Sequence, residues 1–336
     1  MRVVRYAVRR LLWLVPVLVG VSIITFLLLR VLPGDPIERM TSEFIPRARI
    51  EQLKREAGLT DPLPVQYVRY VGRLVRGDAG TSFVTGQPVT SELAEAFPAT
   101  FELTTLAMAL TIVLGLSAGV VAALRKDGVV DHAIRVLAVT GFSVPLFWLG
   151  LLLIYLLYFK LNLLPGPLGR IEPLVPPPAR TTGLFTLDAA LSGNWPALVS
   201  STRMLVLPVV TLAASAIAPL ARMTRAEVLE ALGSEYVRAA QSLGLSRRRI
   251  VRQAVRNGLL PIVTTIASIY GYLLSGSVLV ESIFAWPGMG QYAFNAIANS
   301  DYTAVQGYVL FVTVVYVLIY LVLDIVYHAL DPRVRV

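Results

Sequence analysis

The feature that most constrains this chain is a series of apolar runs, each near or above the roughly 20 residues that an α-helix needs to cross a membrane. The runs are Leu11–Leu29, Leu103–Leu124, Ala133–Phe159, Met204–Ala221, Leu259–Phe284 and Val305–Leu330. Only 15% of the residues are charged, whereas soluble domains carry roughly 25%. Helices satisfy their own backbone in lipid. We therefore predict an all-α membrane protein with six transmembrane helices.

The first apolar run follows Arg2, Arg5, Arg9 and Arg10, an opening that a cleaved signal peptide shares. Its apolar part exceeds the roughly 7 to 15 residues of a signal core, and no small-residue cleavage site precedes Arg30. We expect a retained first helix.

The distribution of basic residues predicts the orientation, because short loops rich in Lys and Arg stay in the cytoplasm. Basic residues lie in the N-terminus, in the second loop at Arg125 and Lys126, in the fourth loop at 222–256 and in the tail. Both termini are therefore expected in the cytoplasm of a plasma or inner membrane, with the chain crossing several times. The first loop also carries arginines. Its length, however, is close to the limit of roughly 60 residues beyond which the charge of a loop no longer determines its side of the membrane.

The two long external loops differ in their predicted structure. In the first, Pro46–Ala57 is typical of a helix, and Pro64 opens a second one with Val68, Val71, Leu74 and Val75 at helical spacing. The third loop, Asn162–Arg203, carries several prolines and is expected to be irregular. The predicted domains are the tail and first helix (1–30), an external loop domain (31–98), a five-helix core (99–330) containing a cytoplasmic loop (222–258), and a cytoplasmic tail (331–336).

Composition and motifs exclude several function classes. The net charge of +9 would suggest nucleic-acid binding in a soluble protein, but here the arginines follow the topology, so no nucleic-acid partner is expected. The chain has no Cys and two distant histidines, His132 and His328, which predicts no disulfide and no metal site. It also lacks a Gly-x-x-x-x-Gly-Lys-Ser/Thr phosphate loop and a catalytic constellation. We expect no catalytic residues and no enzyme activity.

Ionisable groups within the predicted spans are few. Glu281 lies near the outer end of the fifth span, and Asp324 and His328 lie one turn apart near the cytoplasmic end of the last. A local polar pair at the interface explains Asp324 and His328 more simply than a proton relay. An ion-coupled secondary transporter or channel remains the alternative from another class. If the chain transports without its own relay, energy must enter from a partner.

The fourth loop is the largest cytoplasmic segment and the candidate entry point for that energy. Tyr236, Ala239, Ala240 and Leu243 recur at helical spacing, and Gly244 permits a left-handed turn.

A second short helix is predicted after this turn. Ser246 is placed to cap Arg247–Asn257, and Gly258 would end that helix before Pro261 begins the fifth span. The two helices would form a knob that docks into a partner's groove. The alternative is a basic loop that only sets topology.

The loop resembles the EAA motif of ABC importer permeases, whose two short helices dock onto ATP-binding subunits. Arg238-Ala239-Ala240 followed by Gly244 matches its spacing, with arginine in place of the usual leading glutamate. The distance from Gly244 to Leu260-Pro261 is longer than in the general motif. Both departures resemble the dipeptide, oligopeptide and nickel branch of the family.

Three further stretches resemble that branch. They are Phe26–Pro36 at the end of the first span, Gly77–Ser82 with Pro88-Val89 in the external loop, and Glu281–Gly290 after the fifth span; Asp331-Pro332-Arg333 closes the match. The match therefore runs from residue 26 nearly to the tail.

The resemblance implies a B-type permease subunit of an ATP-driven importer for di- or oligopeptides; nickel or glutathione is the alternative cargo. It implies a second homologous permease, two ATP-binding cassette ATPases and an external solute-binding protein as partners, besides membrane lipid and the peptide in transit. ATP and Mg²⁺ would be bound by the ATPases, and no cofactor by this chain. The path would lie near the fifth span, where Gly271 and Gly276 allow close helix approach.

Two sets of site residues follow from the resemblance. The expected ATPase-docking residues are Glu235, Tyr236, Arg238, Ala239, Ala240, Leu243 and Gly244. The expected external gate residues are Pro33, Gly34, Asp35, Pro36, Glu281, Trp286, Pro287 and Gly288. Simpler alternatives exist, since Pro33–Pro36 is also a good turn sequence and Trp286 could be an interfacial anchor of the aromatic belt.

Overall fold

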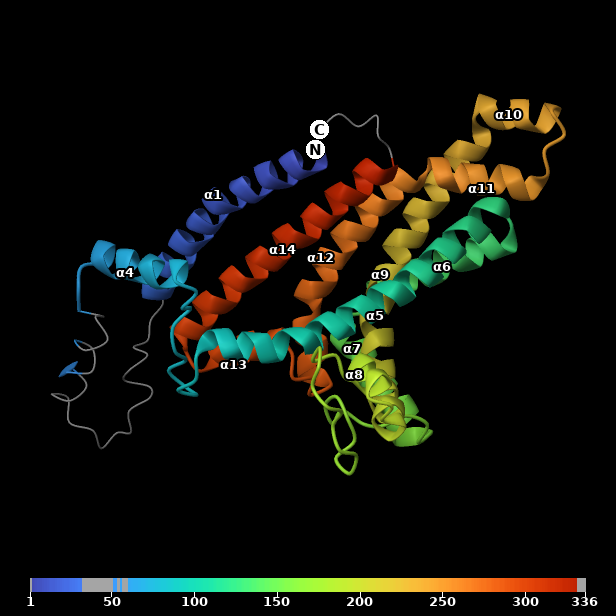
Figure 1. Ribbon diagram of the computed structural model, residues 1–336. Helices are drawn as coiled ribbons and strands as arrows, with labels where there is room; N and C mark the ends of the chain where they lie inside the picture. The colour runs from blue at the N-terminus through green and yellow to red at the C-terminus, as the bar shows by residue number, and fades with distance from the viewer. Residues whose placement is uncertain (1, 32–50, 53–54, 56–59, 331–336) are drawn as a thin grey trace. The chain divides into compact units, whose positions relative to one another are not determined.

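The computed structural model describes residues 2–31, 51–52, 55 and 60–330. Three predicted segments lie wholly or mostly outside these residues: the signature Pro33–Pro36, most of the helix Pro46–Ala57, and the tail from Asp331. The elements are α1 (Arg2–Val31), α4 (Leu63–Val75), α5 (Val89–Leu124), α6 (Val129–Ser143), α7 (Leu146–Leu153), the π-helix η1 (Ile154–Lys160), α8 (Phe185–Leu191), α9 (Trp195–Gly233), α10 (Glu235–Ser242), α11 (Arg247–Asn257), α12 (Leu259–Ile283), α13 (Met289–Ala298) and α14 (Tyr302–Leu330) (Figure 1).

The described part of the chain is all-helical, as predicted. Three helices, α5, α9 and the Tyr302–Val322 part of α14, are long and apolar enough to cross a membrane. The pair formed by α11 and the Leu259–Ser275 part of α12 passes the same criterion together, with a bend of 54° between them. Two shorter apolar helices cover Leu12–Leu28 and Leu146–Lys160.

The third apolar run is not one continuous helix, contrary to the prediction for Ala133–Phe159. The α-helix α6 ends at Ser143, and Val144 has extended backbone angles (φ −77°, ψ 125°) before Pro145. A proline disfavours the helical conformation of the residue before it. The run therefore divides into α6, α7 and η1, and hydrophobicity alone did not reveal the break.

The two loops predicted to be external match their predicted structure in part. Residues 161–184 are irregular, but α8 and the start of α9 form most of the rest of Asn162–Arg203, which corrects the prediction for that loop. Pro196 stands in the first turn of α9, where a missing N–H costs nothing, and Asn194 Oδ1 accepts a hydrogen bond from the Ala197 N–H at 3.1 Å.

The helix that begins at Pro64 is confirmed as α4, but its predicted apolar face is not its buried one. Val68 and Val75 are 70% and 82% exposed, whereas Gln66 and Tyr70 are buried. The Tyr70 ring stacks on Phe26 of α1 with their centroids 6.0 Å apart. Aromatic contacts thus fix the orientation of α4.

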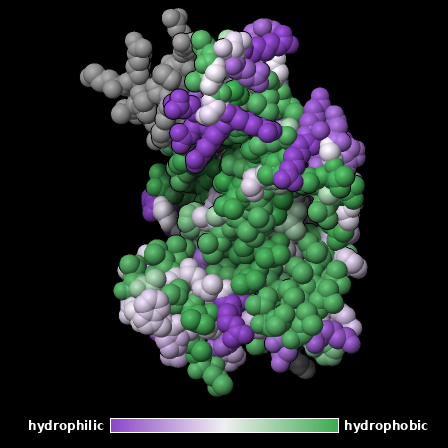
Figure 2. Space-filling view, turned by 90° about the vertical axis from the view of Figure 1, so that its right-hand side faces the viewer, coloured by the Kyte–Doolittle hydropathy of each residue, from purple (hydrophilic) through white to green (hydrophobic). Residues whose placement is uncertain are grey.

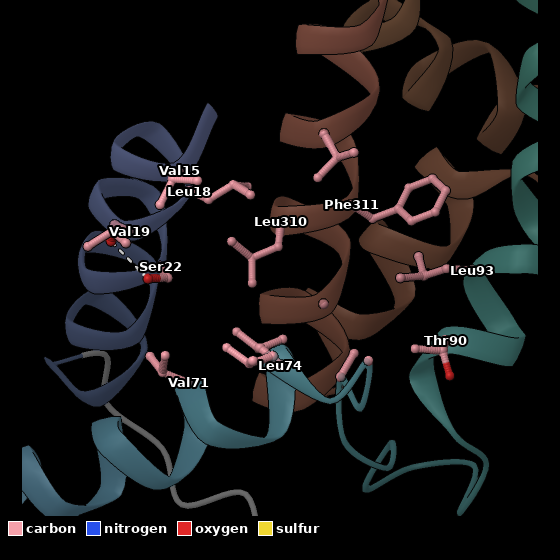
Figure 3. A pocket seen from close by; sticks show the side chains of 15 residues that line it. Val15, Leu18, Val19, Ser22, Val71, Leu74, Thr90, Leu93, Leu310 and Phe311 are labelled. Carbon is pink, nitrogen blue, oxygen red and sulfur yellow. Dashed lines mark hydrogen bonds between the residues drawn. The ribbon is translucent and has the colours of Figure 1, made fainter. Parts of the chain in front are cut away.

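The described residues form two compact units, one up to Phe97 together with Gly288–Leu318, the other Pro98–Pro287 together with residues from Ile319. In the first unit, Val89 and Leu93 of α5 pack with residues of α13 and α14. The same unit has an apolar groove of about 560 Å³ between α1, α4, α5 and α14, into which Val15, Leu18, Leu74, Leu310 and Phe311 point (Figure 3).

The stretch 77–89 is held by contacts within this first unit. Ser82 Oγ donates a hydrogen bond of 2.6 Å to Asp301 Oδ2, and Asp301 Oδ1 accepts from the Ala304 N–H, which caps the start of α14. Gly80 has φ +89°, and a Cβ on it would lie 2.6 Å from Thr303 Cγ2. Both the left-handed backbone and the close approach require glycine here.

In the second unit, α9 is the central helix and contacts α6, α7, α8, α10, α11 and α12. Leu103, Leu212, Leu220, Ile262 and Leu273 are fully or almost fully buried in its core. A Cβ on Gly119 of α5 would lie 2.5 Å from Thr224 Cβ of α9, so glycine allows these helices to approach closely. The hairpin of α10 and α11 extends from this packed region.

Candidate functional site

The cytoplasmic-loop candidate forms the predicted helix, glycine turn and helix. The helix α10 ends where the Gly244 N–H donates to the Gln241 carbonyl at 2.9 Å and the Leu245 N–H donates to the Ala240 carbonyl at 3.1 Å. Gly244 has φ +75°, as expected of a left-handed turn after a helix, and no atom lies within 4 Å of where its Cβ would stand. The turn is therefore set by backbone conformation, not by crowding.

The residues predicted to dock a partner lie together on the exposed side of this hairpin. Tyr236, Ala239 and Gly244 are exposed, Leu243 is 81% exposed, and Ala240 is half-buried. Leucine and tyrosine side chains gain free energy when a partner covers them. The exposed Leu243 beside the tight turn makes the tip suitable for insertion into a groove, and Tyr236 adds an apolar group at the other end of α10.

Arg238 and Glu235, the two charged members of the predicted set, pair with each other. The Arg238 guanidinium donates to Glu235 Oε1 at 3.0 Å, one turn apart, and both side chains are mostly exposed. Exposed pairs of this kind contribute about 0.2 to 0.5 kcal/mol, so both groups can exchange this bond for one to a partner at little cost.

The buried face of the hairpin was missed by sequence analysis. Val237 of α10, and Ile250 and Ala254 of α11, are buried against the second unit. The apolar pair Ile250 and Ala254, one turn apart among arginines, is a signal that could have revealed this face. Burial of these three side chains holds the base of the hairpin against the rest of the second unit.

The second helix has the predicted bounds, Arg247–Asn257, but Ser246 does not cap it. The Ser246 backbone is extended, and its side chain makes no capping hydrogen bond. That part of the prediction is corrected. Gly258 is required for space: a Cβ there would lie 2.9 Å from Glu227 Cβ of α9. The pKa of the Glu227 carboxyl is raised, mainly by its burial and to a smaller extent by the negative charge of the neighbouring Glu230.

An ion pair between Asp131 of α6 and Arg225 of α9 lies near the end of α9 that leads into the hairpin. Arg225 Nε and one guanidinium nitrogen donate to the two carboxylate oxygens of Asp131, each at 2.7 Å. Asp131 is fully buried and Arg225 is 22% exposed. The Arg225 hydrogen bonds, assisted by the Asp127 N–H, lower the pKa of Asp131 to about 2. The pair joins α6 to α9, and no signal in the sequence connects residues so far apart.

Two of the predicted gate residues, Glu281 and Trp286, bind neighbouring positions of α5 within the second unit. Thr100 Oγ1 donates to Glu281 Oε1 at 2.7 Å, and Trp286 Nε1 donates to the Ala99 carbonyl at 2.9 Å. Both Glu281 and Trp286 are buried, so Trp286 does not stand at the surface as an interfacial anchor would. Pro287 is exposed, and Gly288 precedes α13 with extended backbone.

A buried ion pair of the same unit was also missed. The Arg170 guanidinium donates to Glu102 Oε2 at 2.7 Å and to the Gly183 carbonyl at 2.8 Å, and lies 3.8 Å from the Phe185 ring centroid. Burial lowers the pKa of Arg170 and the Glu102 carboxylate raises it, the burial effect being the larger. This contact holds the irregular segment 161–184 against α5.

The exposed side chains of α12 form one stripe. Counting about 100° per residue, they fall within about 80° of arc. They are Thr264, Ser268, Tyr272, Ser275, Leu279 and Ser282. Five of the six carry a hydroxyl group. Exposed hydroxyls on one face of an apolar helix are typical of a helix that borders an aqueous path or a polar partner. The side chains of Asp324 and His328 lie outside those that the structure describes.

Comparison with known proteins shows which family the chain belongs to. Residues 111–336 match the family described as binding-protein-dependent transport system inner membrane component, and residues 3–104 match the N-terminal family of such membrane components. The chain is 41% identical to a probable D,D-dipeptide transport system permease protein of Escherichia coli over 96% of this chain and 94% of the relative.

Two further relatives cover 98% of both chains. A di/tripeptide transport system permease protein of Pseudomonas aeruginosa is 40% identical, and a glutathione transport system permease protein of Pectobacterium atrosepticum is 34% identical. The chain belongs to the family of inner membrane components of binding-protein-dependent transport systems, and is a permease rather than an enzyme.

Proposed function

We propose that this chain is one of two permease subunits of an ABC importer for dipeptides or short oligopeptides, and that α12 lines the path. The observation that carries this proposal is the stripe of α12. Hydroxyl groups can hydrogen-bond with peptide amides in turn without fixing a charge in place. The relatives whose names state dipeptide or di/tripeptide transport support the choice of cargo.

Glutathione or a nickel complex is the second cargo hypothesis. The glutathione permease relative, at 34% identity, favours glutathione, which is itself a peptide. Nickel has less support, because the stripe offers no carboxylate, imidazole or thiolate ligand. An ion-coupled secondary transporter would instead need ionisable groups that change their protonation or bind the coupling ion.

Six spans and cytoplasmic termini are part of the proposal. The four spanning candidates together with the two shorter apolar helices supply one helix or broken helix for each of the six runs. The arginines of the N-terminus, of 222–256 and of the tail favour the cytoplasmic side. The hairpin of α10 and α11 would then lie in the cytoplasm, and α4, α8 and α13 outside.

The hairpin is the proposed docking element for two ATPases, which would bind ATP and Mg²⁺. Closure of the ATPases on ATP would push on Tyr236, Leu243 and the Gly244 turn, and the packed contacts of Val237 and Ile250 would transmit that movement to α9 and α12. Glu235, Arg238, Ala239 and Ala240 complete the docking surface. The solute-binding protein would deliver the peptide to the outer side, where Glu281, Trp286, Pro287 and Gly288 are the proposed gate residues.

Co-purification of the tagged full chain from its native membrane tests this proposal. We expect a second permease and ATPases with the wild type, and loss of the ATPases with Gly244→Arg, because a long charged side chain on the turn would fill the docking surface. Gly86→Arg is a matched control: Gly86 also has positive φ (+72°), open space around its Cβ position and an exposed loop setting. It should retain the ATPases.

Two outcomes would contradict the proposal. If the wild-type chain purifies alone under gentle detergent conditions, the importer assignment fails. If the isolated chain in liposomes moves peptide down an ion gradient, the chain is a secondary transporter. If Gly86→Arg also releases the ATPases, the loss seen with Gly244→Arg is not specific to the hairpin. The docking role of the hairpin would then fail, while the importer assignment would stand.

A further inference from the structure

The helix α11 carries five exposed arginines within its 11 residues. They are Arg247, Arg248, Arg249, Arg252 and Arg256. Within the part of the chain that the structure describes, no ion pair joins any of them to a carboxylate. On the face drawn in Figure 2, hydrophilic side chains gather at the end that carries α10 and α11, beside a broad hydrophobic area. So many unpaired like charges repel one another and favour an anionic partner.

Three of the arginines form a line. Arg248, Arg252 and Arg256 follow one another at intervals of four residues, which places them on one side of the helix. Half-buried Val251 and Val255 border this line. We call Arg248, Arg252 and Arg256 the arginine stripe. A basic stripe beside apolar residues is the pattern of a helix that lies at a membrane surface.

The arginine stripe lies close to the point where the chain enters the apolar α12. Counting about 1.5 Å per residue, Arg256, Arg252 and Arg248 stand roughly 3, 9 and 15 Å along the helix from Gly258. The axes of α11 and α12 differ by 54°. For an α12 along the membrane normal, the three residues therefore rise only about 2, 5 and 9 Å above its start, within about one Debye length of the headgroups.

We propose that the arginine stripe binds the phosphate groups of anionic phospholipids in the cytoplasmic leaflet and so holds α11 at the membrane surface. The proposal rests on the cytoplasmic orientation given above. Each basic residue near an anionic surface strengthens binding roughly fivefold. Anchoring α11 would fix the bend at Gly258 and the direction of the Gly244 turn.

An acidic surface on an ATPase is the competing partner. The structure favours lipid, because the exposed apolar Leu243 stands at the Gly244 turn, the far end of the hairpin, whereas the arginine stripe runs from near that turn back to the membrane end at Arg256. A docking partner that covers the tip leaves room for headgroups beside Arg252 and Arg256.

A single spin label can test the contact, because the chain has no cysteine of its own. Gln253→Cys places the label on α11 at an exposed position outside the arginine stripe. The labelled full chain is placed in nanodiscs of phosphatidylcholine alone or mixed with phosphatidylglycerol. The measurement is the collision rate of the label with a water-soluble nickel chelate. We expect a lower rate with phosphatidylglycerol, and loss of this difference in high salt.

Charge variants decide the cause. Arg248→Gln, Arg252→Gln and Arg256→Gln combined should abolish the lipid difference, whereas the same three changes to Lys should keep it, because lysine still attracts phosphate as a point charge. No difference in the wild type, or a difference that persists in the triple Gln variant, would overturn the proposal.

Repeating the measurement with added ATPases distinguishes a lipid contact from a contact with an ATPase. Protection of the label that requires added ATPases would overturn the lipid proposal in favour of a protein contact. Co-purified ATPases without any lipid dependence would leave the importer intact while this inference fails; a wild-type chain without ATPases would instead count against the proposed function.

Discussion

The Arg225 guanidinium holds both oxygens of the buried Asp131 carboxylate at 2.7 Å, and thereby ties the start of α6 to α9 just before the α10–α11 hairpin. Bidentate Arg–carboxylate pairs fix geometry as well as charge. The pair closes a path of contacts from α6 through α9 to the hairpin. It is therefore placed to stabilise the surface on which an ATPase would push.

The Asp131 carboxylate gives a pH prediction. Its folded pKa of about 2 is below its usual value of 3.8, so its contribution to stability is present above pH 4 and is lost as the pH falls through 2. We expect Asp131→Asn to lower the thermal unfolding midpoint of the solubilised chain by the same amount at pH 7 and pH 5. The gap to the wild type should narrow only below pH 4. A gap that closes between pH 7 and pH 5 would contradict this assignment.

A second prediction concerns the approach of α14 to α5 within the first unit. A Cβ on Gly307 would collide with Val89 Cγ1, and Val89 is fully buried. We expect Gly307→Ala to lower the free energy of unfolding by about 1 to 3 kcal/mol through overpacking. Denaturant titration of the chain in mild detergent measures this loss.

Val89→Ala is the diagnostic partner for Gly307→Ala. The double variant should be more stable than the sum of the two losses predicts, by about 0.5 to 3 kcal/mol, because each change relieves the other. Gly72→Ala is the control, since Gly72 is a helical glycine with open space, and alanine there should be neutral or slightly stabilising. Strictly additive losses would show that the two positions do not touch.

The third prediction concerns the buried pair of Glu102 and Arg170. Glu102→Gln leaves a buried guanidinium without its counter-charge, which costs about 3 to 5 kcal/mol. We expect faster proteolytic cleavage within 161–184, because Arg170 fixes that segment. Adding Arg170→Met should recover part of the loss. Arg69→Gln, which breaks an exposed pair with Asp61, is the control and should change little.

The sequence predicted what depends on local chemistry. Long apolar runs identified the helices that are long and apolar enough to cross a membrane, and Gly244 identified a left-handed turn, because each depends on residues close together along the chain. The bend at Pro145 was also a local signal, but hydrophobicity hid it. The bounds of α11 were predicted from Ser246 before it and Gly258 after it, although the Ser246 side chain does not cap the helix.

Partners across the fold could not be predicted in the same way. Asp131 pairs with Arg225, 94 positions later, and Glu102 with Arg170, 68 positions later. Any of several arginines could have filled either role, since only packing decides which one is near. For the same reason Tyr70, rather than Val68, is the buried contact of α4.

The last prediction tests whether the exposed stripe of α12 borders the transport path. Ser275 stands on this stripe, and a tryptophan there would project a large ring from the same face. We expect Ser275→Trp to reduce peptide uptake by the complete transporter in proteoliposomes at least tenfold, which corresponds to about 1.4 kcal/mol in the transport barrier.

The control is a variant that places the same tryptophan ring on an exposed apolar helix face outside the stripe of α12. Val136 of α6 is 63% exposed in an apolar helix, so Val136→Trp should leave uptake near the wild-type value. Both variants should retain their ATPases, because both positions lie away from the α10–α11 hairpin. Full uptake with Ser275→Trp would exclude this face from the path and assign it to lipid or to the second permease. We expect uptake to fall while ATP hydrolysis continues, because the ring blocks passage of the peptide and does not inhibit the ATPases.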